Sequence, residues 1–280
     1  MPSRRIFLKS SATLAIATAF APSLLAKPIR KVKNAGVQLY SVRTEMMTDA
    51  AGTLKQLAAL GYREIESAGS EKGNYYGLSP KEIKTICGDL GLTLRSGHVR
   101  LDEKFQYALD AASEAGQEYL ICSTMPTDGQ TVDNYKKVAE VFSQAGIVCK
   151  KQGIKFGYHN HAYEFETENG HVLYEVLLAN TDGKHVHMEL DLGWVIDAGK
   201  DPLDYFTRFP GRFPLWHLKD MDLQKKRSTE FGTGSLKIAE MLKNADVAGM
   251  KYFFVEQEEY ASTPLQSLQQ DLDYLKKLEY

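Results

Sequence analysis

The sequence predicts an α/β fold in which parallel strands close into a (β/α)₈ barrel, the TIM barrel, as a single domain over residues 27–280. Short apolar runs alternate with longer segments of helical periodicity along this span, which is typical of parallel strands joined by helices. About eight such units fit, and a barrel of this kind takes roughly 250 residues. An open doubly wound sheet is the alternative, but no G-x-G-x-x-G or P-loop motif follows any predicted strand.

The strands are predicted from short apolar, β-branched or aromatic runs, and the helices from apolar residues spaced three or four apart. The strands cover residues 35–41, 62–67, 93–98, 119–122, 155–159, 187–191, 215–219 and 252–256. The helices cover residues 48–60, 79–90, 101–115, 131–152, 171–179, 202–206, 235–245 and 262–278. Polar residues before four helices are expected N-caps, and glycines after three are expected C-caps. They are Asp49, Ser79, Asp133 and Asp201, and Gly61, Gly91 and Gly153.

The charge balance argues against a nucleic-acid-binding protein. The chain has 34 Lys and Arg against 36 Asp and Glu, for a net charge of -2. Without residues 1–26 it would carry 31 basic and 36 acidic residues, for a net charge of -5. A mildly acidic chain lacks the basic surface that nucleic acids require, whereas small polar substrates stay open.

The three cysteines, Cys87, Cys122 and Cys149, are odd in number, widely spaced and without a C-x-x-C pair. This pattern excludes a disulfide framework and a structural zinc site. We expect buried thiols.

The first 26 residues are predicted to form a signal peptide of the twin-arginine type. Arg4, Arg5 and Lys9 precede a moderately apolar run over residues 12–26. Such a basic start with an apolar middle is typical of export signals. The run is too short and too often interrupted by polar residues and proline for a transmembrane helix. We therefore expect a periplasmic or otherwise exported protein with no stable membrane insertion after export, and an uncleaved anchor is the alternative.

Four predicted strands end in residues that bind metals or move protons. The fifth strand runs into Tyr-His-Asn-His, where alternation along a strand puts His159 and His161 on the same face. The next three end in Glu189 and Asp191, in His217, Lys219 and Asp220, and in Glu256 and Glu258. Because parallel strands of a barrel all run the same way, their ends meet on one face. The sequence therefore predicts a single metal-centred site there.

The order Tyr-His-Asn-His, Glu-Leu-Asp, His-Leu-Lys-Asp, Val-Glu-Gln resembles the xylose-isomerase-like barrel superfamily. This group includes sugar phosphate isomerases/epimerases, ketose 3-epimerases and inosose dehydratases, and the resemblance covers residues 32–280. It implies that His159, Asp191, His217 and Glu256 hold one divalent metal ion. In the epimerases a Glu at the first position is both ligand and base, so histidine at 159 makes a simple ketose 3-epimerase a poorer match.

A mixed oxygen and imidazole shell suits manganese, cobalt, zinc or magnesium. Such an ion polarises a carbonyl and eases loss of the neighbouring proton. His161 is the predicted base, because histidine titrates near neutral pH, and it is also the alternative to His159 as a ligand. Glu164 is predicted to orient a ligand or bind sugar hydroxyls, and Lys219 to stabilise an oxyanion.

Other strand ends resemble the substrate-contacting rim of these barrels. The predicted substrate-binding residues are Gln38, Tyr40, Arg43, Glu66, His98 and Trp194. Structural alternatives stay open for three: Glu66 and His98 could satisfy neighbouring backbone groups, and Trp194 could belong to the core.

Three further expectations concern neighbours of the site. Glu189 is expected to be the buried partner of an arginine, and an extra acid in the site is the alternative. Lys219 and Asp220 could form an ordinary ion pair at a strand end. The glycines of the segment Glu-Phe-Gly-Thr-Gly-Ser (residues 230–235) are expected to form a turn before the seventh helix.

These features predict an exported, metal-dependent enzyme that acts on a small carbohydrate. The resemblance is to the exported branch with Tyr-His-Asn-His, which implies a lyase or hydratase on 3-keto-glycosides. A sugar isomerase or epimerase and a non-catalytic sugar-binding protein are alternatives. A base-excision endonuclease is opposed by the acidic charge, and a homo-oligomer stays open.

Overall fold

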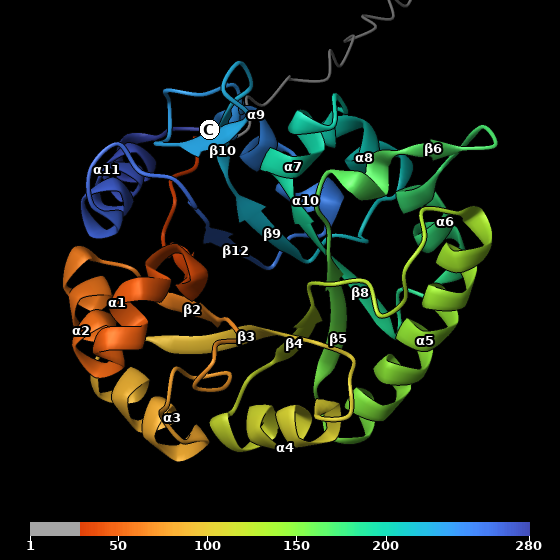
Figure 1. Cartoon of the computed structure of the whole chain (residues 1–280). Coiled ribbons are helices and arrows are strands. Elements are labelled where there is room, and N and C mark those ends of the chain that lie inside the picture. Colours follow the sequence, from red (N-terminus) through yellow and green to blue (C-terminus); the bar gives the residue numbers. More distant parts are fainter. Residues whose placement is uncertain (1–28) are drawn as a thin grey trace, which may run out of the picture.

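Eight parallel strands close into a barrel, and helices form a ring around it (Figure 1). The computed structural model describes residues 29–280, so the predicted signal peptide lies outside the described residues. The strand order around the barrel is β1-β12-β9-β8-β5-β4-β3-β2, in which each barrel strand pairs with the next one along the chain. The predicted single-domain TIM barrel is confirmed.

The barrel strands match the predicted ones within a few residues. They are β1 (Gly36–Gln38), β2 (Glu64–Ser67), β3 (Thr93–Val99), β4 (Tyr119–Cys122), β5 (Lys155–His159), β8 (Val186–Asp191), β9 (Leu215–Leu218) and β12 (Tyr252–Val255). Two short antiparallel pairs follow β5 and β9. They are β6 (Thr167–Glu168) with β7 (His171–Val172), and β10 (Asp220–Asp222) with β11 (Arg227–Thr229).

The helices occupy the predicted places between the strands. They are α2 (Ala50–Leu60), α3 (Pro80–Asp89), α4 (Phe105–Ala115), α5 (Val132–Lys151), α6 (Leu173–Asn180), α8 (Pro202–Arg208), α9 (Ile238–Lys243) with α10 (Ala245–Ala248), and α11 (Pro264–Lys277). Asp49, Ser79 and Asp201 cap helices as expected, whereas Thr131 rather than Asp133 caps α5. Within residues 29–280, no helix combines the length and apolar character needed to cross a membrane.

Short helical turns at the carboxyl ends of three strands were not predicted. They are η1 (Leu39–Val42) with α1 (Arg43–Thr48), η2 (Tyr163–Phe165), and α7 (Leu192–Asp197). The first strand stops at Gln38 because its side chain accepts a hydrogen bond from the backbone N–H of Tyr40 at 3.0 Å and turns the chain. Asp191 caps α7 in a similar way.

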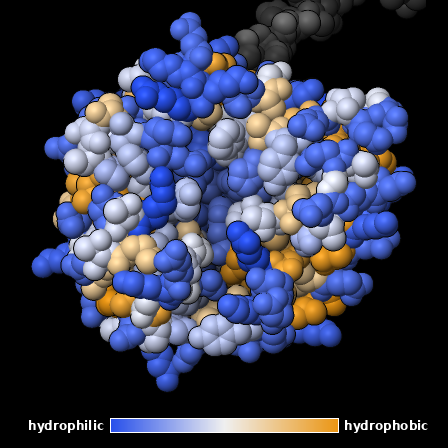
Figure 2. Space-filling model, in the orientation of Figure 1, coloured by the Kyte–Doolittle hydropathy of each residue, from blue (hydrophilic) through white to orange (hydrophobic). Residues whose placement is uncertain are grey.

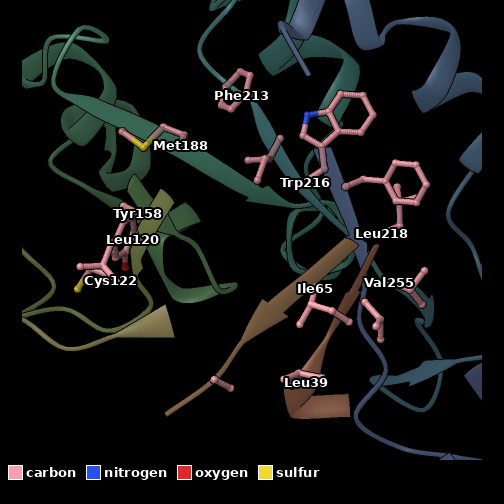
Figure 3. Packing of buried hydrophobic residues seen from close by; sticks show 14 of the residues in the cluster. Leu39, Ile65, Leu120, Cys122, Tyr158, Met188, Phe213, Trp216, Leu218 and Val255 are labelled. Atoms are coloured by element: carbon pink, nitrogen blue, oxygen red, sulfur yellow. The ribbon is translucent and has the colours of Figure 1, made fainter. Parts of the chain in front are cut away.

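Side chains alternate along each barrel strand between the outside, where they pack against the helices, and the inside, where they form the barrel's own core and the site above it. Outward-facing Trp216 of β9 stacks on Phe206 of α8 with ring centroids 4.7 Å apart, and Figure 3 shows the same outer layer of buried apolar side chains. A smaller apolar cluster contains the inward-facing Leu215 and Phe254. Two residues further along these strands, the inward positions hold a histidine and a glutamate. The site therefore lies directly above the barrel's own core. The three cysteine thiols are buried, as predicted.

A buried carboxylate on α11 makes the stability of the fold depend on pH. Oδ1 of Asp271 accepts a hydrogen bond from the backbone N–H of Phe231 at 2.7 Å, while Oδ2 has no partner among the described residues. Burial raises the pKa of Asp271 to about 7, with smaller contributions from Glu230 and Asp220. A carboxyl group with a raised pKa stabilises the fold fully below its unfolded value, near 4, and this contribution is lost as the pH rises to about 7.

We therefore expect Asp271→Asn to stabilise the protein increasingly between pH 5 and pH 8, by roughly 4 kcal/mol at most. The amide keeps the acceptor for Phe231 and removes the buried charge. Urea unfolding at a series of pH values measures the effect. Asp273→Asn, on the same helix with a half-exposed side chain, is the control and should show no such trend. A gain that does not vary with pH would contradict this explanation.

Candidate functional site

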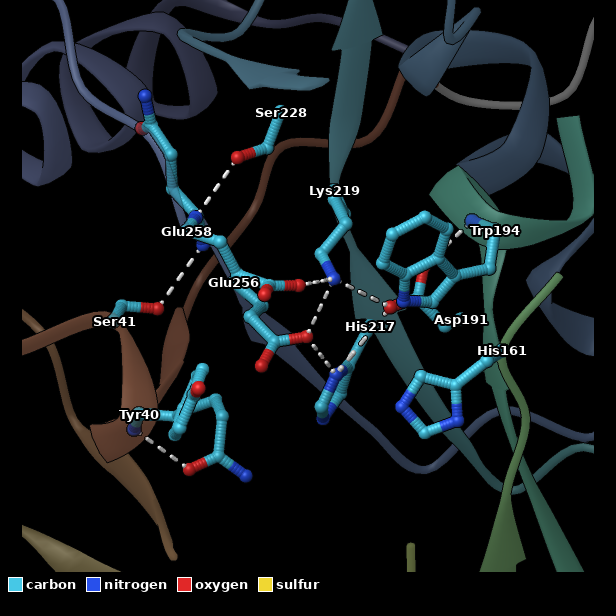
Figure 4. A network of polar contacts seen from close by, with 12 residues as sticks. Tyr40, Ser41, His161, Asp191, Trp194, His217, Lys219, Ser228, Glu256 and Glu258 are labelled. Carbon is cyan, nitrogen blue, oxygen red and sulfur yellow. Dashed lines mark hydrogen bonds and ion pairs between the residues drawn. The ribbon is translucent and has the colours of Figure 1, made fainter. Parts of the chain in front are cut away.

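The four predicted metal ligands meet at the carboxyl end of the barrel. His159 ends β5, Asp191 ends β8, His217 lies in β9 and Glu256 follows β12. All four are buried, and each offers one ligand atom such that these atoms lie within 4.8 Å of one another. Nδ1 of His217 is 2.8 Å from Oε2 of Glu256 and 3.8 Å from Oδ2 of Asp191 (Figure 4). Nε2 of His159 is 3.9 Å from the same Asp191 oxygen.

The oxygens of Asp191 have different surroundings. Oδ1 accepts a hydrogen bond from the backbone N–H of Trp194 at 3.0 Å, which ties it to the first turn of α7. Oδ2 is buried and forms no hydrogen bond within the described part of the chain, although the Lys219 ammonium lies 3.2 Å away as an ion pair. A buried carboxylate oxygen aimed at two imidazoles and a second carboxylate is a donor set that fits a divalent cation.

Lys219 places a positive charge beside the ligands. Its Nζ is 3.2 Å from Oδ2 of Asp191, 3.0 Å from Oε2 of Glu256 and 2.5 Å from Oε1 of Glu258 (Figure 4). Burial lowers the pKa of Lys219, but the three carboxylates outweigh burial and the pKa lies well above its usual value. The side chain is therefore an ammonium ion that contacts two of the four predicted ligands.

Asp220 is not the ion-pair partner of Lys219 among the described contacts, so that alternative is wrong. Its Oδ2 accepts hydrogen bonds from the backbone N–H groups of Gly232 at 3.0 Å and Gly234 at 3.1 Å. Oδ1 accepts from Leu236 at 2.8 Å. The glycine segment is a turn, as predicted, and its amides are held by Asp220.

Glu189 lies in the site and not beside an arginine, so the favoured expectation is wrong and the alternative, an extra acid in the site, is confirmed. Its Oε2 is 2.7 Å from Nε2 of His98, 3.4 Å from Nδ1 of His159 and 3.4 Å from Nε2 of His217. The sequence Glu-Leu-Asp indicates that Glu189 and Asp191 point the same way, because residues two apart on a strand share a face. Glu189 and Asp191 therefore both point into the barrel.

Glu66 and Gln38 were predicted at the substrate-contacting rim. They lie beneath the predicted metal ligands, where with Glu189 and His98 they form a set of side chains that we call the deep layer. Glu66 and Gln38 are both fully buried. Gln38 Nε2 donates to Oε1 of Glu66 at 2.8 Å, and the same oxygen is 2.6 Å from Nε2 of His217 and 3.2 Å from Nε2 of His98. The Ser96 hydroxyl donates to the other oxygen. His98, with an 11% exposed side chain, joins Glu66 to Glu189. These partners are side chains. The alternative that Glu66 and His98 only form hydrogen bonds with neighbouring backbone groups is therefore wrong.

The deep layer carries shifted pKa values. Burial raises the pKa of Glu66, but the His98 and His217 imidazoles lower it by more, so that the pKa is about 2. Burial and the Glu66 charge raise the pKa of Glu189 to about 7. Burial lowers the pKa of His98, but the two carboxylates raise it to about 9. His98 therefore acts as a cation between Glu66 and Glu189.

The two histidines among the four predicted ligands have pKa values shifted in opposite directions. Burial and the neighbouring His217 and His98 charges hold the pKa of His159 well below its usual value. Burial lowers the pKa of His217, but Glu189 and Glu256 raise it well above its usual value. Burial raises the pKa of Glu256, yet Lys219 and His217 bring it well below its usual value. His159 is therefore the imidazole that is neutral near pH 7 and ready to bind a cation.

His161 stands beside the ligand group, with 34% of its side chain exposed. Its ring centroid is 5.1 Å from that of His159 and 6.1 Å from that of Trp194. Figure 4 shows the imidazole on the same side of the site as Trp194. A ring that is half-exposed next to the ligands is placed as a proton-transferring group requires.

Glu164 has a different place from the one predicted for it. The carboxylate is fully buried; Oε1 accepts from the Tyr158 hydroxyl at 2.5 Å and Oε2 from the backbone N–H of His161 at 2.9 Å. Both oxygens are used to hold the loop after β5. Glu164 therefore fixes the backbone of His161 and does not face the ligands.

The remaining predicted residues border the site. Tyr40 is 39% exposed, and the Arg43 guanidinium carbon lies 4.4 Å above its ring centroid. Trp194 is half-buried, with the Lys219 ammonium 4.5 Å from its ring centroid, so it lines the site rather than the core. Figure 2 shows a hollow near the centre of the molecule, lined mainly by hydrophilic residues.

Comparison with known proteins gives the family. Residues 54–278 match the family model described as xylose isomerase-like TIM barrel. An inosose dehydratase of Geobacillus kaustophilus is 22% identical over 215 residues, which are 66% of this chain and 68% of that protein. A crystal structure of a sugar phosphate isomerase/epimerase from Parabacteroides distasonis is 27% identical, with a TM-score of 0.78 over 89% of this chain and 97% of that one. The zinc-containing IOLI protein, 15% identical, shares the fold with a TM-score of 0.69 over 86% of this chain and 96% of that one. The chain belongs to the xylose isomerase-like TIM barrel family.

Proposed function

We propose that this chain is a metal-dependent lyase or hydratase that acts on a 3-keto-glycoside. The observation that carries the proposal is the convergence of four buried donor atoms, within 4.8 Å of one another, beside the half-exposed His161. The likeness to an inosose dehydratase supports an elimination on a ring that carries a carbonyl.

A divalent cation would be held by His159, Asp191, His217 and Glu256, and a crystal of the IOLI protein holds zinc. When bound, such an ion supplies Lewis-acid polarisation of the oxygens beside the reacting carbon. Zinc, manganese, cobalt and magnesium ions all accept such a donor set, and metal analysis of the purified protein identifies the ion that is bound.

His161 takes the proton from C2 of the sugar, next to the C3 carbonyl. The electrons of that C–H bond form the C1–C2 double bond while the bond from C1 to the glycosidic oxygen breaks. The leaving oxygen takes up a proton, from the imidazolium of His161 or from water. The Lys219 ammonium stabilises negative charge on the sugar oxygens, since it is a buried cation beside the predicted ligands. Addition of water to the double bond completes the hydratase reaction.

A single base distinguishes this scheme from a simple ketose 3-epimerase, which uses paired carboxylates. At the strand-five position this chain has His159, whose pKa is low and whose ring belongs to the ligand group. A sugar isomerase or epimerase is the second candidate, and the Parabacteroides distasonis relative favours it. The two candidates differ in the mass of the product.

Purified full-length protein with manganese and a 3-keto-glucoside is expected to release the C1 substituent and form an unsaturated or hydrated keto sugar. Mass spectrometry of the reaction follows both products, and removal of the metal with a chelator should stop their formation. A product of unchanged mass would favour the isomerase or epimerase. No product of either kind would refute the proposal.

We also propose that the protein is exported, because residues 1–26 have the pattern of a twin-arginine signal. An exported lyase would meet glycosides outside the cytoplasm. N-terminal sequencing of the protein from the periplasmic fraction measures this directly, and recovery of the intact chain from the cytoplasm alone would contradict it.

A further inference from the structure

We propose that Glu66 and Glu189, joined by His98, form a positioning layer that fixes the tautomers of His159 and His217. The inference rests on the proposed metal site, but on no property of the substrate. It assigns a role to three residues that contact the predicted ligand rings, of which both glutamates are fully buried.

Each ligand histidine has one ring nitrogen on the side of the other ligands and one on the side of the deep layer. Nδ1 of His217 faces Glu256 at 2.8 Å, and its Nε2 faces Oε1 of Glu66 at 2.6 Å. For His159 the nitrogens are reversed: Nε2 faces Asp191 at 3.9 Å and Nδ1 faces Oε2 of Glu189 at 3.4 Å. Glu66 therefore lies where it accepts the Nε2–H of His217. Nδ1 of His159 has no hydrogen-bond partner among the described residues, and the carboxylate of Glu189 lies near enough to accept its N–H after a small shift.

A second cation in the deep layer is the competing explanation, because ligand atoms of His98, His159, Glu189 and His217 also lie within 4.8 Å of one another. A histidine that binds a cation through one ring nitrogen has lost the proton from that nitrogen, whatever its charge in the metal-free protein, so it keeps at most one N–H. When the bare nitrogens of both rings serve the outer cation, their inner nitrogens carry protons and cannot bind a metal. A second cation would need two rings stripped of both protons, whereas carboxylate acceptors need only the neutral rings.

His98 keeps the two carboxylates in place. Its Nε2 lies 2.7 Å from Oε2 of Glu189 and 3.2 Å from Oε1 of Glu66. Gln38 donates to the same Glu66 oxygen at 2.8 Å. The His98 ring also stacks on that of His217, with centroids 5.3 Å apart and an interplanar angle of 9°. The deep layer is thus a continuous set of contacts that ends on the ligand rings.

The test uses Glu66→Gln and Glu189→Gln, which keep the shape of each side chain and remove its charge. We expect zinc affinity, measured by competition with a chelating dye, to fall about 10- to 100-fold in each variant. Glu64→Gln is the control, because Glu64 lies on the same strand but pairs with Arg95, 2.6 Å away. Its zinc affinity should equal that of the wild type.

Nitrogen-15 NMR of the zinc-loaded protein gives a second readout that is independent of affinity. In the wild type the proton is expected on Nε2 of His217 and on Nδ1 of His159, and the variants should lose or shift these signals. Wild-type affinity and wild-type tautomers in folded Gln variants would overturn the positioning role.

Two zinc ions per chain, with one lost in His98→Gln, would also overturn it in favour of a second metal site. A wild-type chain that takes up no zinc would overturn the assignment of the metal ligands, and the positioning layer with it. Turnover enters neither readout, so a protein that is inert toward 3-keto-glycosides but shows these losses would leave the positioning layer standing and refute only the proposed function.

Discussion

Asp191→Asn is expected to weaken binding of manganese or zinc by roughly 100-fold or more, beyond the loss typical of residues that only orient a ligand, and to abolish turnover of the 3-keto-glycoside. The amide keeps a carbonyl oxygen to accept the Trp194 N–H, now 3.0 Å from Oδ1, so α7 keeps its cap. It replaces the charged Oδ2, which faces the imidazoles, with an NH₂ group that cannot bind a cation. Calorimetric titration with the metal chloride and metal analysis of the purified protein measure the loss.

Asp201→Asn is the matched control for this variant. Asp201 caps α8 through the backbone N–H of Leu203 at 2.9 Å and is exposed, so the same change there should leave metal binding intact. Full metal content in Asp191→Asn would remove Asp191 from the ligand set. Retention of metal by the double variant Asp191→Ala/His217→Ala would refute the whole assignment.

The fold and the convergence of the four predicted ligands could be predicted because both depend on spacing along the chain. Residues two apart on a strand share a face, and parallel strands in a barrel deliver their ends to one mouth. The sequence Met-Glu-Leu-Asp therefore determines that Asp191 points into the barrel once the strand is recognised. The same logic placed His217 and Glu256, which sit at inward positions of β9 and β12 or just beyond them.

The contacts within the deep layer could not be predicted, because they join side chains from strands on different sides of the barrel. Glu189 was expected to pair with an arginine, but its partner His98 lies on β3, distant in sequence from β8. The conformation of the loop after β5 also determines side-chain contacts that spacing along the chain does not reveal. Glu164, three residues after His161, turns back to hold that residue's backbone, so a carboxylate near the site in sequence does not face it.

His161→Gln is expected to lower kcat by roughly 10²- to 10⁴-fold, the usual contribution of a general base, while metal affinity stays unchanged. The ring lies beside the ligand group and is half-exposed, whereas the ligand His159 is buried. Glutamine fills a similar volume but cannot take up a proton. Steady-state kinetics and calorimetric metal titration on the same preparation separate the two effects.

This pair of measurements also decides between the two histidines of the Tyr-His-Asn-His segment. If His161 were the ligand in place of His159, its variant would lose metal together with activity. His171→Gln is the control, since His171 is exposed on β7 outside the groups of metal-ligating residues. It should match the wild type in both measurements. Loss of activity with full metal content in His161→Gln would identify the His161 imidazole as the proton acceptor. A single imidazole base separates this site from one with two carboxylate bases.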